Sequence, residues 1–152
     1  MTPEERLAEL GLTLPKVVPP VAAYVPTSRT GNHVYVSGQV PFVDGKLADT
    51  GKVGADVTAE RAAELARICA LNALAALAAE VGELSRVVKI VKVVGFVASA
   101  PDFTGQPQVI NGASELLVEV LGEAGKHARS AVGVAALPLD APVEVELIAE
   151  VR

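Results

Sequence analysis

Cysteine, histidine and aromatic residues are scarce in this 152-residue chain, which has one Cys, two His, no Trp and only 3% aromatic residues. A single cysteine, Cys69, excludes both an intramolecular disulfide and a metal site built from several cysteines. The two histidines, His33 and His127, are not in a His-x-x-x-His spacing, so that zinc motif is absent as well. Cys69 lies inside a predicted helix, and we interpret it as a buried, inert thiol.

Positive charge and long apolar runs are also lacking. The chain has 13 Lys and Arg against 18 Asp and Glu, giving a net charge of −5. Nucleic-acid binding depends on clustered basic residues, so this balance argues against it. No run reaches the roughly 18 apolar residues that a membrane span needs, and the charged start lacks the apolar stretch of a signal peptide. We therefore expect no membrane segment, and a cytoplasmic location.

Hydrophobic residues, mostly Ala and Val, make up 51% of the chain, and this excess hints at subunit interfaces. The length predicts one domain, residues 1–152, in which residues 1–19 form an N-terminal helix and a Pro-rich extension. Hydrophobic periodicity and capping residues predict the elements in order: a helix at 3–10, a hairpin of strands 22–29 and 33–39, a loop at 43–57, a helix at 59–81, a strand at 87–98, a helix at 107–121, and two final strands around the connection 137–142. This order predicts an α+β fold, a mixed sheet with two helices on one face.

The strand at 87–98 has apolar residues at both odd and even positions. Such a strand is usually covered on both faces. We expect the helices to cover one face and a neighbouring subunit the other.

The last quarter of the chain carries the strongest candidate for a site. If the Val-rich faces of the two final strands look toward the same core, Arg129 and Glu144 both look away from it. A simple hairpin would separate their levels by about six residues, on the order of 20 Å at ~3.3 Å per residue. We therefore predict that the strands are not a simple hairpin, or that Arg129 meets Glu144 of a neighbouring subunit.

Most catalytic templates fail on this sequence. There is no Gly-x-Ser-x-Gly elbow and no Gly-x-Gly-x-x-Gly fingerprint, and Gly51-Lys52 lacks the rest of a phosphate-binding loop. What remains is a group of four residues, in which an Arg fork could hold a carboxylate and a Glu could orient water: Tyr24, Ser37, Arg129 and Glu144. The candidates also have structural interpretations: Arg129 and Glu144 could form a surface ion pair, and Tyr24 could simply pack at a strand start. Outside this group, His127 is either a loop or strand-end residue or an acid-base group. Asn72 is either a core amide bonded to the backbone or a catalytic residue.

Several motifs together resemble the YjgF/Rid family, the reactive intermediate deaminases. They keep the family's order over residues 20–151: Tyr24-Val25, Tyr35-Val36-Ser37-Gly38-Gln39-Val40-Pro41, Phe96-Val97, Asp102-Phe103, Ala128-Arg129-Ser130, Leu137-Pro138 and Val143-Glu144-Val145-Glu146. The resemblance implies a chorismate-mutase-like α+β fold, a homotrimeric, barrel-type assembly and ligand clefts between subunits.

The resemblance also implies roles for individual residues. Arg129 matches the residue that clamps the substrate carboxylate, and Glu144 matches the acid that positions the hydrolytic water. Three further residues match the cleft lining: Tyr24, Ser37 and Phe103. In the implied reaction, water adds to the C=N carbon of a small 2-imino acid or its enamine, and ammonia leaves to give a 2-keto acid. Because the imine is already electrophilic, the reaction implies no metal and no organic cofactor.

Departures from the family pattern place this chain in a longer subfamily. His127 stands where the deaminases commonly have Pro, and Ala131 where they have a Cys that contributes mainly its backbone. The segment between Phe103 and Arg129 is longer, and the N-terminal helix is extra. Members of this subfamily are often labelled "putative endoribonuclease" or translation inhibitor. Two other functions therefore stay open: a non-catalytic binder of small carboxylate metabolites, and a ribonuclease.

Overall fold

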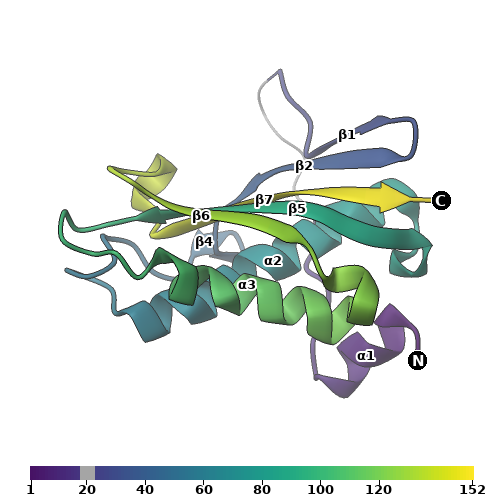
Figure 1. The fold of residues 1–152 in the computed structure, drawn as a ribbon, viewed down its shortest axis with the longest axis horizontal. Coiled ribbons are helices and arrows are strands. Elements are labelled where there is room, and N and C mark those ends of the chain that lie inside the picture. Colours follow the sequence, from purple (N-terminus) through teal and green to yellow (C-terminus); the bar gives the residue numbers. More distant parts are fainter. Residues whose placement is uncertain (18–22) are drawn as a thin grey trace.

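The computed structural model describes residues 1–17 and 23–152 and shows an α+β domain with helices packed on one face of a sheet (Figure 1). The elements follow in this order: α1 (Pro3–Glu9), β1 (Thr27–Thr30), β2 (His33–Gln39), β3 (Phe42–Val43), β4 (Lys46–Leu47), α2 (Ala59–Val81), β5 (Val87–Ala98), α3 (Gln106–Leu121), β6 (Ala128–Val134) and β7 (Val143–Val151). Three short 3₁₀ turns complete the described chain: η1 (Leu84–Arg86), η2 (Gly122–Gly125) and η3 (Pro138–Asp140).

The main sheet has five strands in the order β1-β2-β7-β5-β6. Only β5 and β6 run parallel, and the other neighbours are antiparallel, so the predicted mixed sheet is confirmed. β5 lies between β6 and β7, which shows that the two final strands do not pair as a hairpin. The helix α3 between β5 and β6 provides the crossover that a parallel pair requires.

Helices α2 and α3 lie side by side beneath the sheet (Figure 1). Thr58 caps α2 by accepting a hydrogen bond from the Arg61 backbone, and Gly82 ends the helix at a positive φ of 93°. A Cβ atom at Gly112 of α3 would collide with the Ala63 carbonyl of α2, so the two helices approach at backbone distance. By length and apolar composition alone α2 could cross a membrane, but its buried side chains pack in this core.

The core lies between the helices and one face of the sheet. The side chains on that face are fully or almost fully buried and come from three strands: Val34, Val36, Ile90, Val93, Val97, Val145, Leu147, Ala149 and Val151. The alternate residues of β7, among them Glu144 and Glu146, are only partly buried and face the open side of the sheet. Within this chain nothing among the described elements covers that side (Figure 1).

The extra N-terminal helix α1 is docked on the domain. Thr2 and Glu5 form a reciprocal capping box at its start. Arg6 Nη1 donates to the Val120 carbonyl at the end of α3, and Glu4 accepts from the Leu84 backbone in η1. Leu7 is buried in the core cluster, so the helix is part of the folded domain.

Two of the predicted elements differ from the structure by more than one residue. The first hairpin strand was predicted from residue 22, but β1 begins at Thr27, and Pro26 meets β2 only by accepting a hydrogen bond from the Ser37 backbone. The predicted start at Ala22 and the end of the Pro-rich extension lie outside the described residues. The predicted loop at 43–57 contains the hairpin β3–β4, whose Asp44-Gly45 turn has φ angles of 51° and 82°, as two-residue turns require.

Candidate functional site

Arg129 lies on the edge strand β6 and points to the helix side of the sheet. It is paired with Val93, which is fully buried, and its Nη1 donates to Asn111 Oδ1 at 2.8 Å and Ser114 Oγ at 3.3 Å on α3. The expectation that the Val-rich face of this strand looks toward the core is therefore wrong. That face, with Val132 at 43% exposure, is on the open side.

Close packing of α3 explains this orientation of β6. A Cβ atom at Gly133 would lie 2.7 Å from Gln106 Nε2, so there is little room for a side chain at this position. Ala131 packs partly buried against the core at the next position on the same face. The small residues therefore face α3, and the valines face the open side of the sheet.

Glu144 lies at the start of β7 and points to the open side, in register with Phe96 of β5. Its carboxyl group rests against Gly38 of β2, where an added Cβ atom would lie 2.8 Å from Glu144 Cδ. Burial raises the pKa of the Glu144 carboxyl above its ordinary value, and the neighbouring charge of Glu146 adds to the rise. A carboxylate in this state binds a proton more readily than an exposed one, as a general base requires.

Ser37, near the end of β2, is bonded to the two residues that follow Tyr24 in the chain. Ser37 Oγ donates to the Val25 carbonyl at 3.0 Å, and the Ser37 backbone N–H donates to Pro26. These two bonds hold the segment next to Tyr24, a residue that is 61% exposed. Gly38, which contacts Glu144, directly follows Ser37, so these residues belong to the same region as Glu144.

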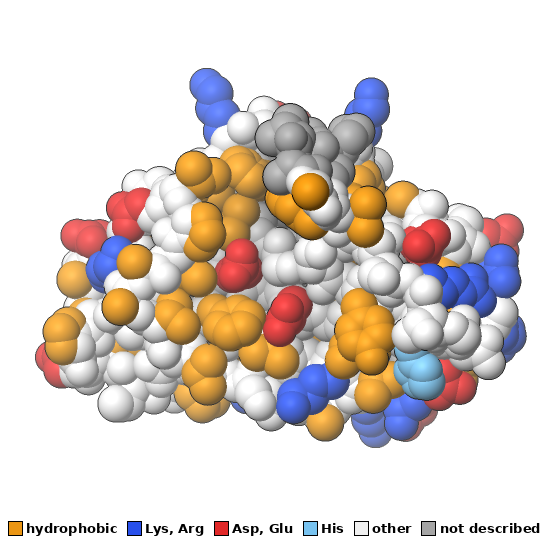
Figure 2. Space-filling model, turned by 90° about the horizontal axis from the view of Figure 1, so that it is seen from above, with side chains coloured by type: hydrophobic (Ala, Val, Ile, Leu, Met, Phe, Trp, Pro, Cys, Tyr) orange, Lys and Arg blue, Asp and Glu red, His pale blue; other side chains and the backbone are white. Residues whose placement is uncertain are grey.

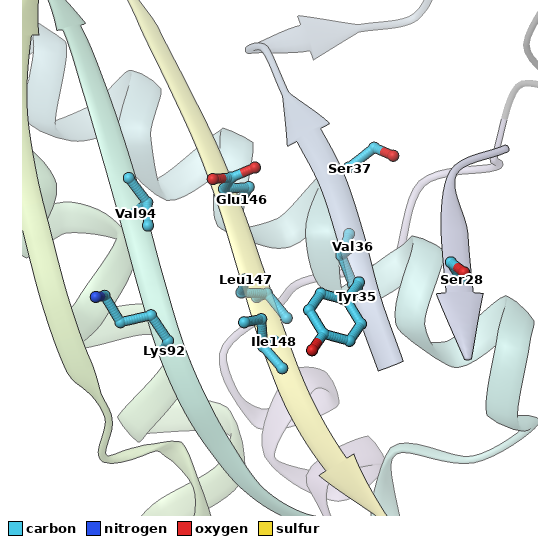
Figure 3. A pocket seen from close by; sticks show the side chains of 9 residues that line it. All are labelled: Ser28, Tyr35, Val36, Ser37, Lys92, Val94, Glu146, Leu147 and Ile148. Atoms are coloured by element: carbon cyan, nitrogen blue, oxygen red, sulfur yellow. The ribbon is translucent and has the colours of Figure 1, made fainter. Parts of the chain in front are cut away.

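The open face is slightly hollowed along β2, β7 and β5 (Figure 3). The hollow has a volume of about 380 Å³, and nine residues line it: Ser28, Tyr35, Val36, Ser37, Lys92, Val94, Glu146, Leu147 and Ile148. Seen from above, this face carries many hydrophobic side chains with acidic ones among them (Figure 2). Of the predicted site residues only Ser37 lines the hollow.

Phe103 follows the end of β5 and packs partly buried against the core. Its side chain contacts Gly54, whose added Cβ atom would lie 2.9 Å from Phe103 Cβ, and its carbonyl accepts from Gln106 Nε2. β5 and β6 are parallel and end together at Ala98 and Val134. Phe103 therefore lies at the same end of the sheet as Gly133, on the β6 side.

The predicted site residues thus form two separate groups in one chain. Arg129 is in register with Leu147 of β7 through Val93, three residues from Glu144. Neighbouring strands are ~4.8 Å apart, β5 lies between β6 and β7, and the rise is ~3.3 Å per residue, so the Cα atoms of Arg129 and Glu144 are about 14 Å apart. Because the two side chains leave opposite faces of the sheet, one chain does not bring Arg129 and Glu144 together.

The sequence interpretation missed the partners of Arg129. Ser114 Oγ is 2.8 Å from His127 Nε2, and His127 Nδ1 is 2.6 Å from the Gly125 carbonyl. Asn111 and Ser114 are three residues apart and therefore share one face of α3. That spacing was the available signal, but nothing in the sequence indicated that this face lies over the edge of β6.

The contacts and burial of Asn72 and Cys69 decide between the interpretations given for these two residues. Asn72 Nδ2 donates to the carbonyls of Val40 and Phe42, so it is the backbone-satisfied amide that was one of the two interpretations. Cys69 is fully buried, as predicted, and burial raises the pKa of its thiol well above its ordinary value. Among residues 1–17 and 23–152 no three His, Cys, Asp or Glu side chains gather as metal ligands.

A family model described as "YjgF/chorismate mutase-like, putative endoribonuclease" matches residues 4–151. Two solved structures align over 99% of this chain. The protein Atu1372 with unknown function from Agrobacterium tumefaciens has 50% identity, 92% of that chain covered and a TM-score of 0.93. A "putative endoribonuclease" from Shewanella oneidensis MR-1 has 38% identity, full coverage of that chain and a TM-score of 0.96.

Similarity to another solved relative is lower. TdcF from E. coli, solved with bound serine, has 25% identity and a TM-score of 0.65 over 88% of this chain and 91% of its own.

Proposed function

Because the chain belongs to the YjgF/chorismate mutase-like family, we propose that it hydrolyses small 2-imino acids and their enamine tautomers to 2-keto acids in the cytoplasm. The observation that carries the proposal is the chemistry of two side chains. Arg129 is a cation held in place by α3, and Glu144 is a partly buried carboxylate with a raised pKa. An anion clamp and a proton acceptor are the two groups that this hydrolysis requires.

Arg129 binds the substrate carboxylate. Its planar guanidinium can donate two parallel hydrogen bonds to the two carboxylate oxygens, which fixes the orientation of the imine carbon. A charged, hydrogen-bonded anchor of this kind converts the attack of water into a reaction between positioned groups. Support comes from TdcF of E. coli, a relative solved with serine, itself a small carboxylate.

Glu144 acts first as the general base and then as the general acid of the reaction. It accepts a proton from the water that attacks C2 and passes it to the imine nitrogen, so that the oxygen adds to the C=N carbon and a tetrahedral carbinolamine forms. It then takes the proton of the new hydroxyl and delivers it to the nitrogen as the C–N bond breaks, so that the C=O bond forms and ammonia leaves with a 2-keto acid as the product. Atoms balance with one water consumed, and no electron transfer occurs. The raised pKa of Glu144 suits both the accepting and the donating step.

Two chains build each cleft in this proposal. Arg129 and Glu144 lie on opposite faces of their own sheet, so a shared site needs Arg129 from one chain and Glu144 from another. A homotrimer supplies three such sites by symmetry. The half-exposed Tyr35 and Val132 on the open face are the kind of side chains that a subunit interface buries.

The test generates 2-iminobutyrate in solution with an amino-acid oxidase and follows release of 2-oxobutyrate. We expect the protein to accelerate release, and Arg129→Ala and Glu144→Gln each to lose most of the effect. The matched controls are Arg67→Ala, which removes a surface ion pair between α2 and Glu119 of α3, and Glu150→Gln, on the same face of β7 as Glu144. No acceleration by the pure wild-type protein, or equal acceleration by Arg129→Ala, overturns the proposal.

The two alternatives are separated in the same preparation. A non-catalytic carboxylate binder would show Arg129-dependent calorimetric affinity for 2-oxobutyrate without accelerating imine hydrolysis. A ribonuclease would cleave RNA in a salt-sensitive manner after repurification, which the net charge of −5 argues against.

A further inference from the structure

Among the described residues, the Arg129 guanidinium is held from one side only, by α3. Nη1 donates to two acceptors on α3, Asn111 Oδ1 at 2.8 Å and Ser114 Oγ at 3.3 Å. Because the guanidinium is planar, two bonds to Nη1 restrict the plane of the whole group. Neither Nε nor Nη2 donates to an acceptor among residues 1–17 and 23–152.

The free edge is the one that binds carboxylates. Nε–H and one hydrogen of Nη2 point in parallel, at a spacing that matches the two oxygens of a carboxylate. The contacts of Nη1 therefore leave one complete bidentate edge available and block the other. Arg129 is presented to a ligand in a single orientation.

His127 fixes the hydroxyl of Ser114. A carbonyl oxygen only accepts, so His127 Nδ1 donates to Gly125 at 2.6 Å. In the neutral ring Nε2 is then the acceptor, and Ser114 O–H donates to it at 2.8 Å. A serine inside a helix otherwise tends to donate to the carbonyl four residues back. With its hydrogen directed to His127, Ser114 offers its lone pair to Arg129.

A Ser–His contact also occurs in enzymes with a nucleophilic serine, but Ser114 lacks the surroundings for that chemistry. It lies in the middle of α3, where backbone N–H groups are bonded within the helix and none is free to stabilise an oxyanion. Its oxygen also accepts from Arg129, which lowers its nucleophilicity. The contacts therefore favour a positioning role.

We propose that Asn111, Ser114 and His127 form a positioning network that holds Arg129 with its Nε–Nη2 edge free for a planar carboxylate. The ligand of this network, a small carboxylate, is taken from the function proposed above, and the inference rests on that function. It makes affinity depend on three residues that do not touch the substrate, because they act through Arg129. It also predicts a preference for carboxylates over the corresponding neutral amides.

The first measurement needs no ligand. The Arg129 Nε–H signal is identified by its loss in Arg129→Lys, and its NMR order parameter is measured in the whole protein. We expect a rigid value near 0.85 in the wild type and a fall below about 0.6 in the Asn111→Ala/Ser114→Ala double variant. Glu115→Gln, at an exposed neighbouring position on α3, is the control and leaves the value unchanged. A signal that stays rigid in the double variant overturns the network.

The second measurement is calorimetric affinity for 2-oxobutyrate. We expect Kd to rise about 5- to 30-fold in Asn111→Ala and in Ser114→Ala, in line with the loss of hydrogen bonds to a charged group. Ser114→Thr, which keeps the hydroxyl, should restore the affinity to within about twofold, and a merely structural role would not show this rescue.

The two proposals fail in different ways. Arg129-dependent binding with unchanged Kd in both alanine variants refutes the network and leaves the proposed function standing. A wild-type protein that neither binds 2-oxobutyrate nor hydrolyses the imine refutes the proposed function, and the order parameter alone then decides whether the network holds Arg129.

Discussion

Arg129 and Glu144 lie on opposite faces of one sheet, on the two strands that flank β5. In one chain this arrangement separates the cation from the carboxylate. In an assembly it gives each chain two half-sites, one at the β6 edge and one on the open face beside β2. The proposed hydrolysis therefore requires an oligomer, and each half-site can be perturbed separately.

Gly38→Ala tests the contact that places Glu144. The new Cβ atom would lie 2.8 Å from Glu144 Cδ, and the flexible carboxyl end can move aside, so the fold should survive. We expect turnover of 2-iminobutyrate to fall by about 10- to 100-fold, since the misplacement of a catalytic group by about 1 Å can cost that much. In a Glu144→Gln background Gly38→Ala should add little, and a full additional loss there would contradict this explanation.

The raised pKa of Glu144 predicts a pH-dependent gain in stability for Glu144→Gln. A carboxyl with a raised folded-state pKa binds its proton more tightly in the folded state, so its ionisation destabilises the fold. Below the unfolded value of 4.5 both states are protonated and the penalty is absent; it develops as the pH rises through 4.5 and is complete above the folded pKa. Urea unfolding at equal chain concentration should therefore show the variant gaining stability relative to wild type between about pH 4 and pH 8. Glu150→Gln is the control, and a gain that is independent of pH would show that ionisation of Glu144 is not its cause.

Gly112→Ala tests the close approach of α2 and α3. In an isolated helix this change stabilises by about 1 kcal/mol. Here the new Cβ atom collides with the Ala63 carbonyl, so we expect a net loss of about 1–3 kcal/mol in the free energy of unfolding. Gln108→Ala, at an exposed position on the same helix, should stay within about 0.5 kcal/mol. A stabilising effect of Gly112→Ala would show that the helices do not touch there.

Cys69 should be chemically silent in the folded protein. Its side chain is fully buried and burial raises the pKa of its thiol, so little reactive thiolate forms. We expect a disulfide reagent at pH 8 to modify it only at the rate at which the protein opens, and rapidly once urea unfolds the chain. Fast stoichiometric modification of the native protein would contradict the buried position.

The sequence predicted the local elements well because the signals for them are local. Thr58 and Gly82 mark the two ends of α2, and the alternation in β7 separates the buried valines from Glu144 and Glu146. The resemblance to the YjgF/Rid family was confirmed by the match over residues 4–151.

The arrangement of the site was not predictable because it depends on non-local packing. Alternation in β6 shows which residues share a face but not which face meets the core. The approach of Gln106 to Gly133 decides that question. The contact between Arg129 and Asn111 likewise depends on where α3 crosses the sheet edge, and no pattern within either segment encodes that position.

The most direct test of the two-chain cleft mixes two inactive variants. Arg129→Ala and Glu144→Gln chains are unfolded together in equal amounts and refolded, with each variant refolded alone as control. If Arg129 and Glu144 come from different chains of a trimer, about three quarters of the random trimers are mixed and each holds one complete site in three. The mixture should then recover about one quarter of wild-type imine hydrolysis. No recovery above the separate variants, with mixed trimers shown to have formed, would contradict a cleft shared between Arg129 of one chain and Glu144 of another.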